Sequence, residues 1–554
     1  MPSTSDLFPP APFDIAAIRW AEHDAWWSDD TEAIQKIYSG QGAQTAHTHI
    51  HNGRPYRGGV RGNLSKMWWG QPVVDGEART KMHLGVPAML ARLSAALLLG
   101  EAAKIRWEKP ADATTGAKWV HPGQARLDVI MASDETHAEL LKSVEYSAAL
   151  GGAYLAVTWN KALRTHVRIR AYATDCAIPE FQDGILTGVT LWTEYQVDSD
   201  TYRLLERHDR GMVSFTLHKG GPKVLGEVVP LSTLPETSHY NGLRTEAEVT
   251  TALDFPELWN ESVVVATGVD DLAVVYFPND LPQTDWRKLG VLANLGRSDF
   301  AGIEELFDKI DQIWSSLLRD FNNGAGRITA PEAYLEQGGP GQGATIDLNR
   351  EVYSGINALG SSGDSLASQL TVSQFDIRVK EHLDAVDALK REIATRVGYS
   401  PQHLGLKAAE GAGQKTATEV FSDFTASELT RDKKALYLKP ALARLAQVAL
   451  AIDGVVFPAE GGKFYDELPD VEFAPVSQVD PEKTARIVGL ADVARAMSTR
   501  TRVQEMHRDW DDEQVAEEVE LINQENAIPL DPMVPPDFGA TDQTATDQGT
   551  QPAG

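Results

Sequence analysis

The sequence predicts an α+β fold, in which an antiparallel sheet forms within the first 300 residues and long helices follow. Between residues 154 and 218, five segments alternate apolar and polar side chains with the period of a β-strand. Beyond residue 301, apolar side chains instead recur every third or fourth position over three long stretches, as on amphipathic helices. At 554 residues, the chain is long enough for several domains.

Two helices are expected around the start of the sheet. Residues 87–99 place apolar side chains at helical spacing, with Pro87 in the first turn and Gly100 as a stop. Residues 140–150 repeat this pattern and end at Gly151. The expected strands cover residues 154–159, 167–172, 188–196, 202–208 and 213–218.

Three long amphipathic helices are expected after residue 301. The first covers residues 301–323, and the second covers residues 377–397 and stops at Gly398. The third begins at a capping box on Thr416, and Pro440 should kink it because proline removes a backbone hydrogen bond and crowds the preceding turn. A last helical segment covers residues 481–525.

A glycine-rich stretch at residues 337–363 and a polar tail at residues 526–554 mark boundaries. Strands inferred around residues 327–335 and 344–348 would suit pairing with another subunit, since an open strand edge invites another chain. A flexible surface loop is the alternative for this region. The tail cannot bury enough apolar surface to offset its ordering entropy, so disorder is expected there.

The net charge of −28 is unevenly spread along the chain. Residues 1–170 hold 19 Lys and Arg against 17 Asp and Glu, whereas residues 480–554 hold 6 against 16. Tight binding of DNA needs clustered Lys and Arg, so a sequence-specific DNA reader is excluded. Solubility is the plain explanation of an acidic surface.

The ends and the apolar runs of the chain point to a protein made inside the cell. The longest uncharged apolar run, residues 93–100, is too short to span a bilayer, so no membrane segment is expected. Residues 1–12 lack the basic start and apolar stretch of a secretory signal. The lone Cys176 cannot form an internal disulfide.

Two motifs suggest chemistry without completing it. His47, His49 and His51 alternate as on one face of a strand and are able to hold zinc, which would suit a metal-dependent hydrolase. No Asp or Glu lies close by to act as a base, so a surface loop is the better interpretation. Residues 410–416 partly match the sequence pattern of a phosphate-binding loop, but Ala409 and Gln414 stand where that pattern requires glycine. We expect no cofactor, no metal site and no catalysis.

Carboxylates gather on single faces of two of the long helices. Glu304, Asp308 and Asp311 share one face of the helix at 301–323, and Glu381 and Asp384 share one face of the next. Paired carboxylates can bind magnesium or act as acid and base, but on a long amphipathic helix they are usually the solvated face.

Six short segments, taken in order, form a recognisable pattern. They are residues 97–101, 149–154, 302–320, 374–378, 397–402 and 415–420. Together they resemble the portal proteins of long-tailed bacteriophages, and the likeness covers most of residues 60–525. The first 60 and the last 30 residues add nothing to it.

The resemblance implies a mainly helical portal fold built from named parts. Residues 1–300 would form an α/β wing, of which the first 60 are unassigned, and residues 480–525 a helical crown. Two stem helices at 301–323 and 373–397 would flank a small α/β clip at 324–372. A tunnel loop at 398–414 would lead to a long kinked helix and a return to the wing at 415–479.

The same resemblance implies where DNA and the packaging motor would be met. Gln402, His403, Lys407 and Lys415 are the expected DNA-facing residues of the tunnel loop, although an ordinary solvated turn is the alternative. Glu304, Asp308, Asp311, Glu381 and Asp384 are the candidates to line the channel from the stem. Arg327, Glu332 and Glu336 are expected on the clip surface that faces the terminase.

The resemblance also implies the partners and the location. The chain would form a ring of about twelve copies at one capsid vertex of the virion, after assembly in the host cytoplasm. Its partners would be the terminase large subunit, a head-completion or adaptor protein, the major capsid and scaffold proteins, and double-stranded DNA that passes without sequence specificity. The alternatives are the hydrolase that uses His47, His49 and His51, and a general head scaffold protein without a channel.

Overall fold

The structure, a computed structural model, describes ten main stretches of the chain. They are residues 8–34, 36–37, 82–108, 119–243, 262–323, 377–406, 417–474, 481–507, 510 and 512–527, with four short strands between 327 and 373. The chain falls into two compact units, residues 1–111 with 120–474 and residues 112–119 with 475–554. The tail at 526–554, which we expected to be disordered, lies almost wholly outside the described residues.

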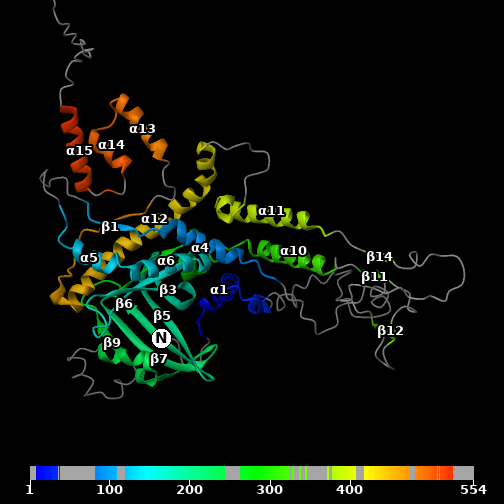
Figure 1. The fold of residues 1–554 in the computed structure, drawn as a ribbon. Helices are drawn as coiled ribbons and strands as arrows, with labels where there is room; N and C mark the ends of the chain where they lie inside the picture. The colour runs from blue at the N-terminus through cyan, green and yellow to red at the C-terminus, as the bar shows by residue number, and fades with distance from the viewer. Residues whose placement is uncertain are drawn as a thin grey trace, which may run out of the picture. The chain divides into compact units, whose positions relative to one another are not determined.

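Two antiparallel sheets form the β part of the first unit (Figure 1). One has the order β10 (Val274–Pro278), β2 (Gly152–Thr158), β3 (Arg168–Ala173). The other has the order β4 (Ala177–Gln182), β5 (Ile185–Val197), β6 (Asp200–Asp209), β7 (Met212–Gly221), β8 (Val224–Val229), with β9 (Val263–Ala266) paired to β7. All five expected strands are present, which confirms the predicted α+β class, and β4, β8, β9 and β10 were not predicted.

Both faces of β2 are buried, which fits a strand with helices on one side and apolar side chains on the other. Tyr154 lies opposite Tyr172 of β3 and Tyr276 of β10, and belongs to an apolar cluster between the two sheets. α6 (Asp134–Leu150) packs on β2 and β3. The three-stranded sheet therefore forms a central layer of the first unit.

The helices expected at 87–99 and 140–150 are confirmed as α4 (Val86–Leu99) and α6. α6 begins earlier than expected because the Ser133 side chain accepts a hydrogen bond from the Thr136 amide at 3.2 Å and caps its first turn. α1 (Phe13–Trp27) and α5 (Gln124–Met131) were not predicted. Trp26 of α1 is fully buried against Phe307, so the N-terminal segment is part of the core.

α10 (Glu304–Asn323) and α11 (Val379–Val397) confirm the next two predicted helices, and they pack against each other (Figure 1). α12 (Ala417–Val456) continues through Pro440 as a single helix. Pro440 has no backbone N–H to donate to the carbonyl of Leu436. Leu436 is 72% exposed, so water can take the place of that hydrogen bond. The capping residue Thr416 lies outside the described residues.

Part of α12 is apolar enough to cross a membrane by length and composition, although we expected no such segment. This stretch is Thr425–Val456, and 67% of its most apolar window is buried inside the protein. Leu442, Leu445 and Ala449 are fully buried there, and α12 packs on β10, β2 and α4. The apolar surface of α12 is thus used by the protein core.

Four short strands follow α10 and precede α11. β11 (Arg327–Thr329) pairs with β14 (Thr371–Ser373), and β12 (Glu336–Gln337) pairs with β13 (Ala344–Thr345), both antiparallel. The predicted strands are therefore present in shorter form and pair within the chain. Pairing with another subunit stays a prediction.

The remaining elements are short or belong to the second unit. β1 (Lys104–Arg106) pairs with β15 (Asp470–Glu472), and α7 covers Pro235–Ser238. The 3-10 turns are η1 (Thr174–Cys176), η2 (Leu231–Thr233), η3 (His239–Leu243), η4 (Gly290–Asn294), η7 (Pro401–Leu404) and η8 (Pro458–Glu460). In the second unit, the helical segment expected at 481–525 is three helices: α13 (Pro481–Val493), α14 (Thr499–Met506) and α15 (Asp512–Ala527).

Candidate functional site

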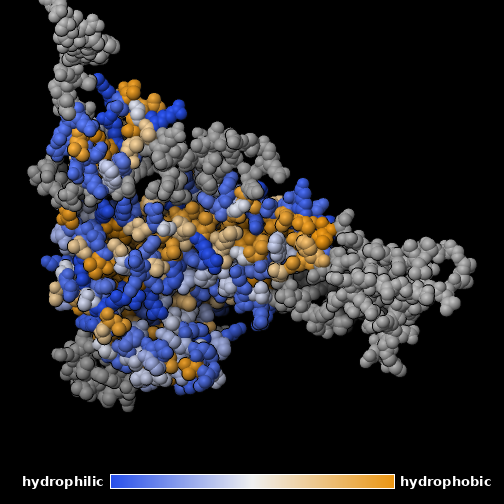
Figure 2. Space-filling view, in the orientation of Figure 1, coloured by the Kyte–Doolittle hydropathy of each residue, from blue (hydrophilic) through white to orange (hydrophobic). Residues whose placement is uncertain are grey.

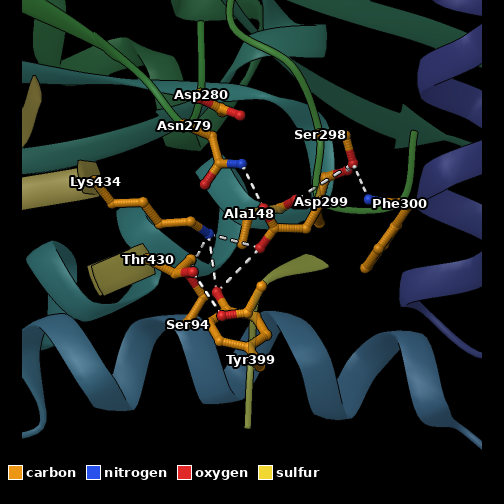
Figure 3. A network of polar contacts seen from close by, with 12 residues as sticks. Ser94, Ala148, Asn279, Asp280, Ser298, Asp299, Phe300, Tyr399, Thr430 and Lys434 are labelled. Atoms are coloured by element: carbon orange, nitrogen blue, oxygen red, sulfur yellow. Dashed lines mark hydrogen bonds and ion pairs between the residues drawn. The ribbon is translucent and has the colours of Figure 1, made fainter. Parts of the chain in front are cut away.

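A buried lysine, Lys434 of α12, joins four parts of the first unit (Figure 3). Its Nζ donates hydrogen bonds to Asp299 Oδ2 at 2.6 Å, Ser94 Oγ at 2.7 Å and Tyr399 Oη at 3.0 Å. Ser94 belongs to α4, Asp299 to the loop before α10, and Tyr399 to the segment directly after α11. One ammonium group on α12 therefore contacts α4, the loop that leads into α10 and the segment that follows α11.

The surroundings of Lys434 keep it charged and keep Tyr399 neutral. Burial alone would lower the pKa of Lys434, but the Asp299 charge and the bonds to Asp299 and Tyr399 outweigh it and raise that pKa. Burial and the Asp299 charge raise the pKa of Tyr399 to about 12. Asp299 Oδ1 accepts a further hydrogen bond from Asn279 Nδ2 at 2.8 Å, so the buried ion pair is well compensated.

The loop that leads into α10 is fixed to the end of α6 by backbone contacts. The Asp299 amide donates to Ala148 O at 2.9 Å, and Ser298 Oγ donates to Ala149 O at 2.6 Å. A Cβ added to Gly296 would lie 2.0 Å from Gly151 O, so the two backbone segments approach too closely for any side chain at residue 296. The start of α10 is thus held in place independently of Lys434.

The first part of the expected tunnel loop forms the turn η7, and its polar residues are half-buried. His403 Nδ1 lies 2.8 Å from Ser427 Oγ of α12, and burial lowers the pKa of His403. A neutral imidazole is a weak ligand for phosphate. Gln402 Oε1 is buried and has no hydrogen-bond partner within the described part of the chain. Lys407 and Lys415 lie outside the described residues.

Two of the three carboxylates expected on a solvated face of α10 are buried instead. Glu304 is 7% exposed and lies 3.1 Å from His23 Nε2, and Asp311 is 4% exposed and lies 2.7 Å from His83 Nδ1. Burial opposes ionisation of Glu304, but His23 and Arg19 outweigh it and lower its pKa. The expectation of a solvated face is therefore wrong for these two residues, which have almost no surface left to line a channel.

The carboxylates of α11 do lie on a solvated face. Glu381 and Asp384 are exposed, and Asp308 of α10 is half-buried and accepts a hydrogen bond from Gln312. Asp320 of α10 binds His382 and Arg378 across the hairpin, each at 3.1 Å. The hairpin therefore buries one acidic set and exposes another.

Apolar side chains gather near the end of the hairpin where α10 ends and α11 begins (Figure 2). Leu318 and Phe321 of α10 and Leu383 of α11 are exposed there. They flank the contact of Asp320 with His382, which places them at one end of the helix pair. Exposed apolar groups of this kind suit packing against another protein surface.

The remaining candidates lie in short strands or outside the described residues. Arg327 begins β11 and Glu336 begins β12, whereas Glu332 lies outside the described residues. The zinc candidates His47, His49 and His51 lie outside them too. Within the described ranges, no group of three His, Cys, Asp or Glu side chains is arranged to hold a metal ion.

The residues of the Lys434 network were not predicted from the sequence. The available signal was the spacing of Ser427, Thr430 and Lys434, three polar residues on one face of a helix that is otherwise apolar toward the core. Asp299 carried no comparable signal, because its partners lie far away in the chain.

Comparison with known protein families identifies the chain. Residues 74–528 match the family model described as phage portal protein, SPP1 Gp6-like, so the chain belongs to this portal protein family. Proteins of this family are virion components of the phage head-to-tail connector. No curated protein sequence matches the chain.

Solved structures similar to the chain come from gene transfer agent particles. A chain from the neck of an empty particle computed with C6 symmetry is 15% identical, with a TM-score of 0.37, and the match covers 82% of this chain and 95% of that one. A chain from the neck of a native particle computed with C12 symmetry is 13% identical, with a TM-score of 0.36, 80% and 98% coverage. A chain from the virion of a native particle is 15% identical, with a TM-score of 0.35, 81% and 99% coverage.

Proposed function

We propose that this portal protein forms, with further copies of itself, a closed ring whose channel passes double-stranded DNA into and out of the capsid. Membership of the portal family over residues 74–528 carries the proposal. The hairpin of α10 and α11, followed by a short segment and the long helix α12, supplies the parts that such a channel needs. The chain acts as a structural conduit and not as an enzyme.

The parts of the chain are assigned as follows. Residues 1–300 form the wing, α10 and α11 the stem, 324–372 the clip, 398–414 the tunnel loop, 415–479 the return to the wing, and the second unit around 480–525 the crown. The clip meets the terminase large subunit during packaging and a head-completion protein afterwards. The exposed Leu318, Phe321 and Leu383 pack against a neighbouring copy, because a closed ring needs unlike surfaces that match.

An acidic channel wall suits the passage of DNA. Each contact between a cationic side chain and a phosphate would slow movement of the duplex, whereas exposed carboxylates repel phosphates and keep it mobile. Glu381 and Asp384 of α11 are exposed. They are the candidates to line the channel together with Asp308, and Glu304 and Asp311 are not.

Deletion of residues 411–413 tests the tunnel loop. A shortened loop should reduce the amount of DNA packaged per particle while rings still assemble. Packaging at the level of the unchanged protein would remove the loop from the proposal.

Deletion of residues 324–372 tests the clip in the same way. Loss of terminase binding, measured with the purified motor subunit, is expected. Full terminase binding by the deleted protein would assign motor docking to another surface.

Zinc titration by calorimetry separates the portal from the hydrolase alternative. The channel proposal predicts no tight zinc binding that depends on His47, His49 and His51. Tight binding lost on replacing these three residues would favour the hydrolase.

A further inference from the structure

Three polar side chains of α12 lie on one helix face and all contact the segment that follows α11. Ser427, Thr430 and Lys434 are spaced by three and four residues, which places them in one row along the helix. The segment is residues 398–406, the first part of the proposed tunnel loop. Together their contacts reach from the start of the segment at Gly398 to the turn η7.

Each of the three side chains makes a specific bond to this segment. Ser427 is fully buried, and its Oγ accepts from the Ser400 amide at 2.8 Å and lies 2.8 Å from His403 Nδ1. Thr430 Oγ1 donates to Gly398 O at 2.6 Å. Lys434 Nζ reaches Tyr399 Oη at 3.0 Å, as Figure 3 shows. Side chains of α12 therefore satisfy both backbone and side-chain groups of the segment.

The segment turns so close to α12 that its first residue must be glycine. Gly398 ends α11 with a φ of 91°, in the left-handed region. A Cβ at this position would lie 2.5 Å from Thr430 Oγ1. The turn and the Thr430 hydroxyl thus fit one another without spare room.

Lys434 extends the same row of contacts to other elements. Besides Tyr399, it binds Asp299 before α10 and Ser94 of α4. The segment, α12 and the start of α10 are therefore joined through one buried group. A displacement of residues 398–406 relative to α12 would break several buried polar contacts at once.

We propose that Ser427, Thr430 and Lys434 are positioning residues that fix residues 398–406 onto α12, so that this segment and the helix move as one body. The inference rests on the proposed function, because Gln402 and His403 belong to the expected DNA-facing loop. It means that any movement of the loop base during DNA passage is shared with α12 and, through Lys434, with the start of α10.

Hydrogen exchange of the full-length protein tests this directly. Thr430→Val removes the hydroxyl while keeping the size of the side chain, and leaves Gly398 O without its donor. Loss of a buried hydrogen bond should raise local opening, so peptides covering residues 398–406 should exchange about tenfold faster. Thr430→Ser, which keeps the hydroxyl, should restore the slow exchange.

Thr395→Val is a matched control. Thr395 Oγ1 also donates to a backbone carbonyl, that of Arg391 at 2.8 Å, but it is exposed on α11 and does not touch the segment. Its replacement should leave exchange of residues 398–406 unchanged. If Thr430→Val fails to fold, Ser427→Ala serves in its place, because it removes the bond to the Ser400 amide.

Unchanged exchange in Thr430→Val or in Ser427→Ala would overturn the inference. Faster exchange over the whole first unit, rather than in residues 398–406 alone, would also overturn the inference. Ser427, Thr430 and Lys434 would then contribute to general stability. The amount of packaged DNA is a separate readout, expected to fall in Thr430→Val and to recover in Thr430→Ser. If the unchanged protein forms no channel, the proposed function fails while the exchange result still decides the positioning role.

Discussion

At the scale of single residues, the fold depends on buried charges that are each closely matched. Lys434 lies among Ser94, Asp299 and Tyr399, all within hydrogen-bonding distance of its ammonium group. Such a group is stabilised only while its partners remain, because the cost of removing a charge from water is large. A cation at this position therefore specifies how the helices meet more than it adds net stability.

Replacement of Lys434 by methionine should destabilise the protein strongly. Lys434→Met leaves the Asp299 carboxylate buried without its cation, so the free energy of unfolding should fall by about 3 to 5 kcal/mol in urea denaturation. The neighbouring Lys433 is half-exposed and pairs with Asp280 at 2.5 Å. Lys433→Met should cost less than about 1 kcal/mol. Equal effects of the two changes would contradict this view of the Lys434 network.

At the scale of elements, α10 is attached to its surroundings by three histidine and carboxylate pairs. Glu304 pairs with His23 of α1, Asp311 with His83, and Asp320 with His382 of α11. His83 also lies 3.1 Å from Asp29 Oδ1. Burial opposes protonation of His83, but the hydrogen bonds and charges of Asp311 and Asp29 outweigh it and raise its pKa above 6.5.

The attachment of α10 through His83 should weaken as pH rises. A raised folded-state pKa means that the stabilisation is complete below the unfolded value of about 6.5 and is lost as pH rises through the folded value. Asp29 and Asp311 are the charged groups that face His83. His83→Gln should lower the free energy of unfolding by about 1 to 3 kcal/mol near pH 6.

Measurement of unfolding over a series of pH values separates the charged contact of His83 from a general packing effect. The difference between the unchanged protein and His83→Gln should shrink between pH 6 and pH 9. His239→Gln, a change at an exposed histidine, should keep the pH dependence of the unchanged protein. A His83→Gln difference that stays constant with pH would refute the charged contact.

Reversing the charge of the exposed face of α11 should slow DNA passage. Glu381→Lys together with Asp384→Lys gives the channel wall cations that bind phosphates, so the packaging rate should fall and the fall should lessen at higher salt. Glu236→Lys together with Asp270→Lys makes the same charge change at exposed sites on other elements. Equal packaging by both double variants would show that this face of α11 does not meet DNA.

The elements with strong periodicity were predictable from the sequence, and those shaped by distant partners were not. α4, α6, α10 and α11 show a clear helical spacing of apolar side chains. In α1 the buried Glu22 and His23 interrupt that spacing: Glu22 binds Arg19 of the same helix, and His23 faces Glu304 of α10. The strand β10 pairs with β2, which precedes it by more than 100 residues, so its pairing partner has no local signal.

The same limit applies to the candidate site. Glu304 and Asp311 look like solvated residues because carboxylates usually are, yet His23 and His83 make their burial possible from more than 220 residues away. The row of Ser427, Thr430 and Lys434 is visible as a spacing, but its partner segment is not. Gln402 and His403 lie in the turn after α11, and their place in a tunnel loop and their exposure to DNA stay predictions.

At the scale of the whole molecule, charge and family membership support the same function. The net negative charge lies entirely in residues beyond 170, because residues 1–170 hold slightly more Lys and Arg than Asp and Glu; the later residues include the proposed stem and crown. Such a surface holds DNA weakly, as a conduit must, while still leaving apolar patches for contacts between copies. Residues 74–528 belong to the phage portal family, and a portal is a protein that would use both the acidic surface and the apolar patches.

Electron microscopy of the purified full-length protein tests the central claim most directly. Closed rings with a central hole are predicted, with the α10–α11 hairpins surrounding that hole in the averaged images. Monomers, solid particles or shells under the same conditions, or rings whose hairpins point away from the hole, would contradict the account.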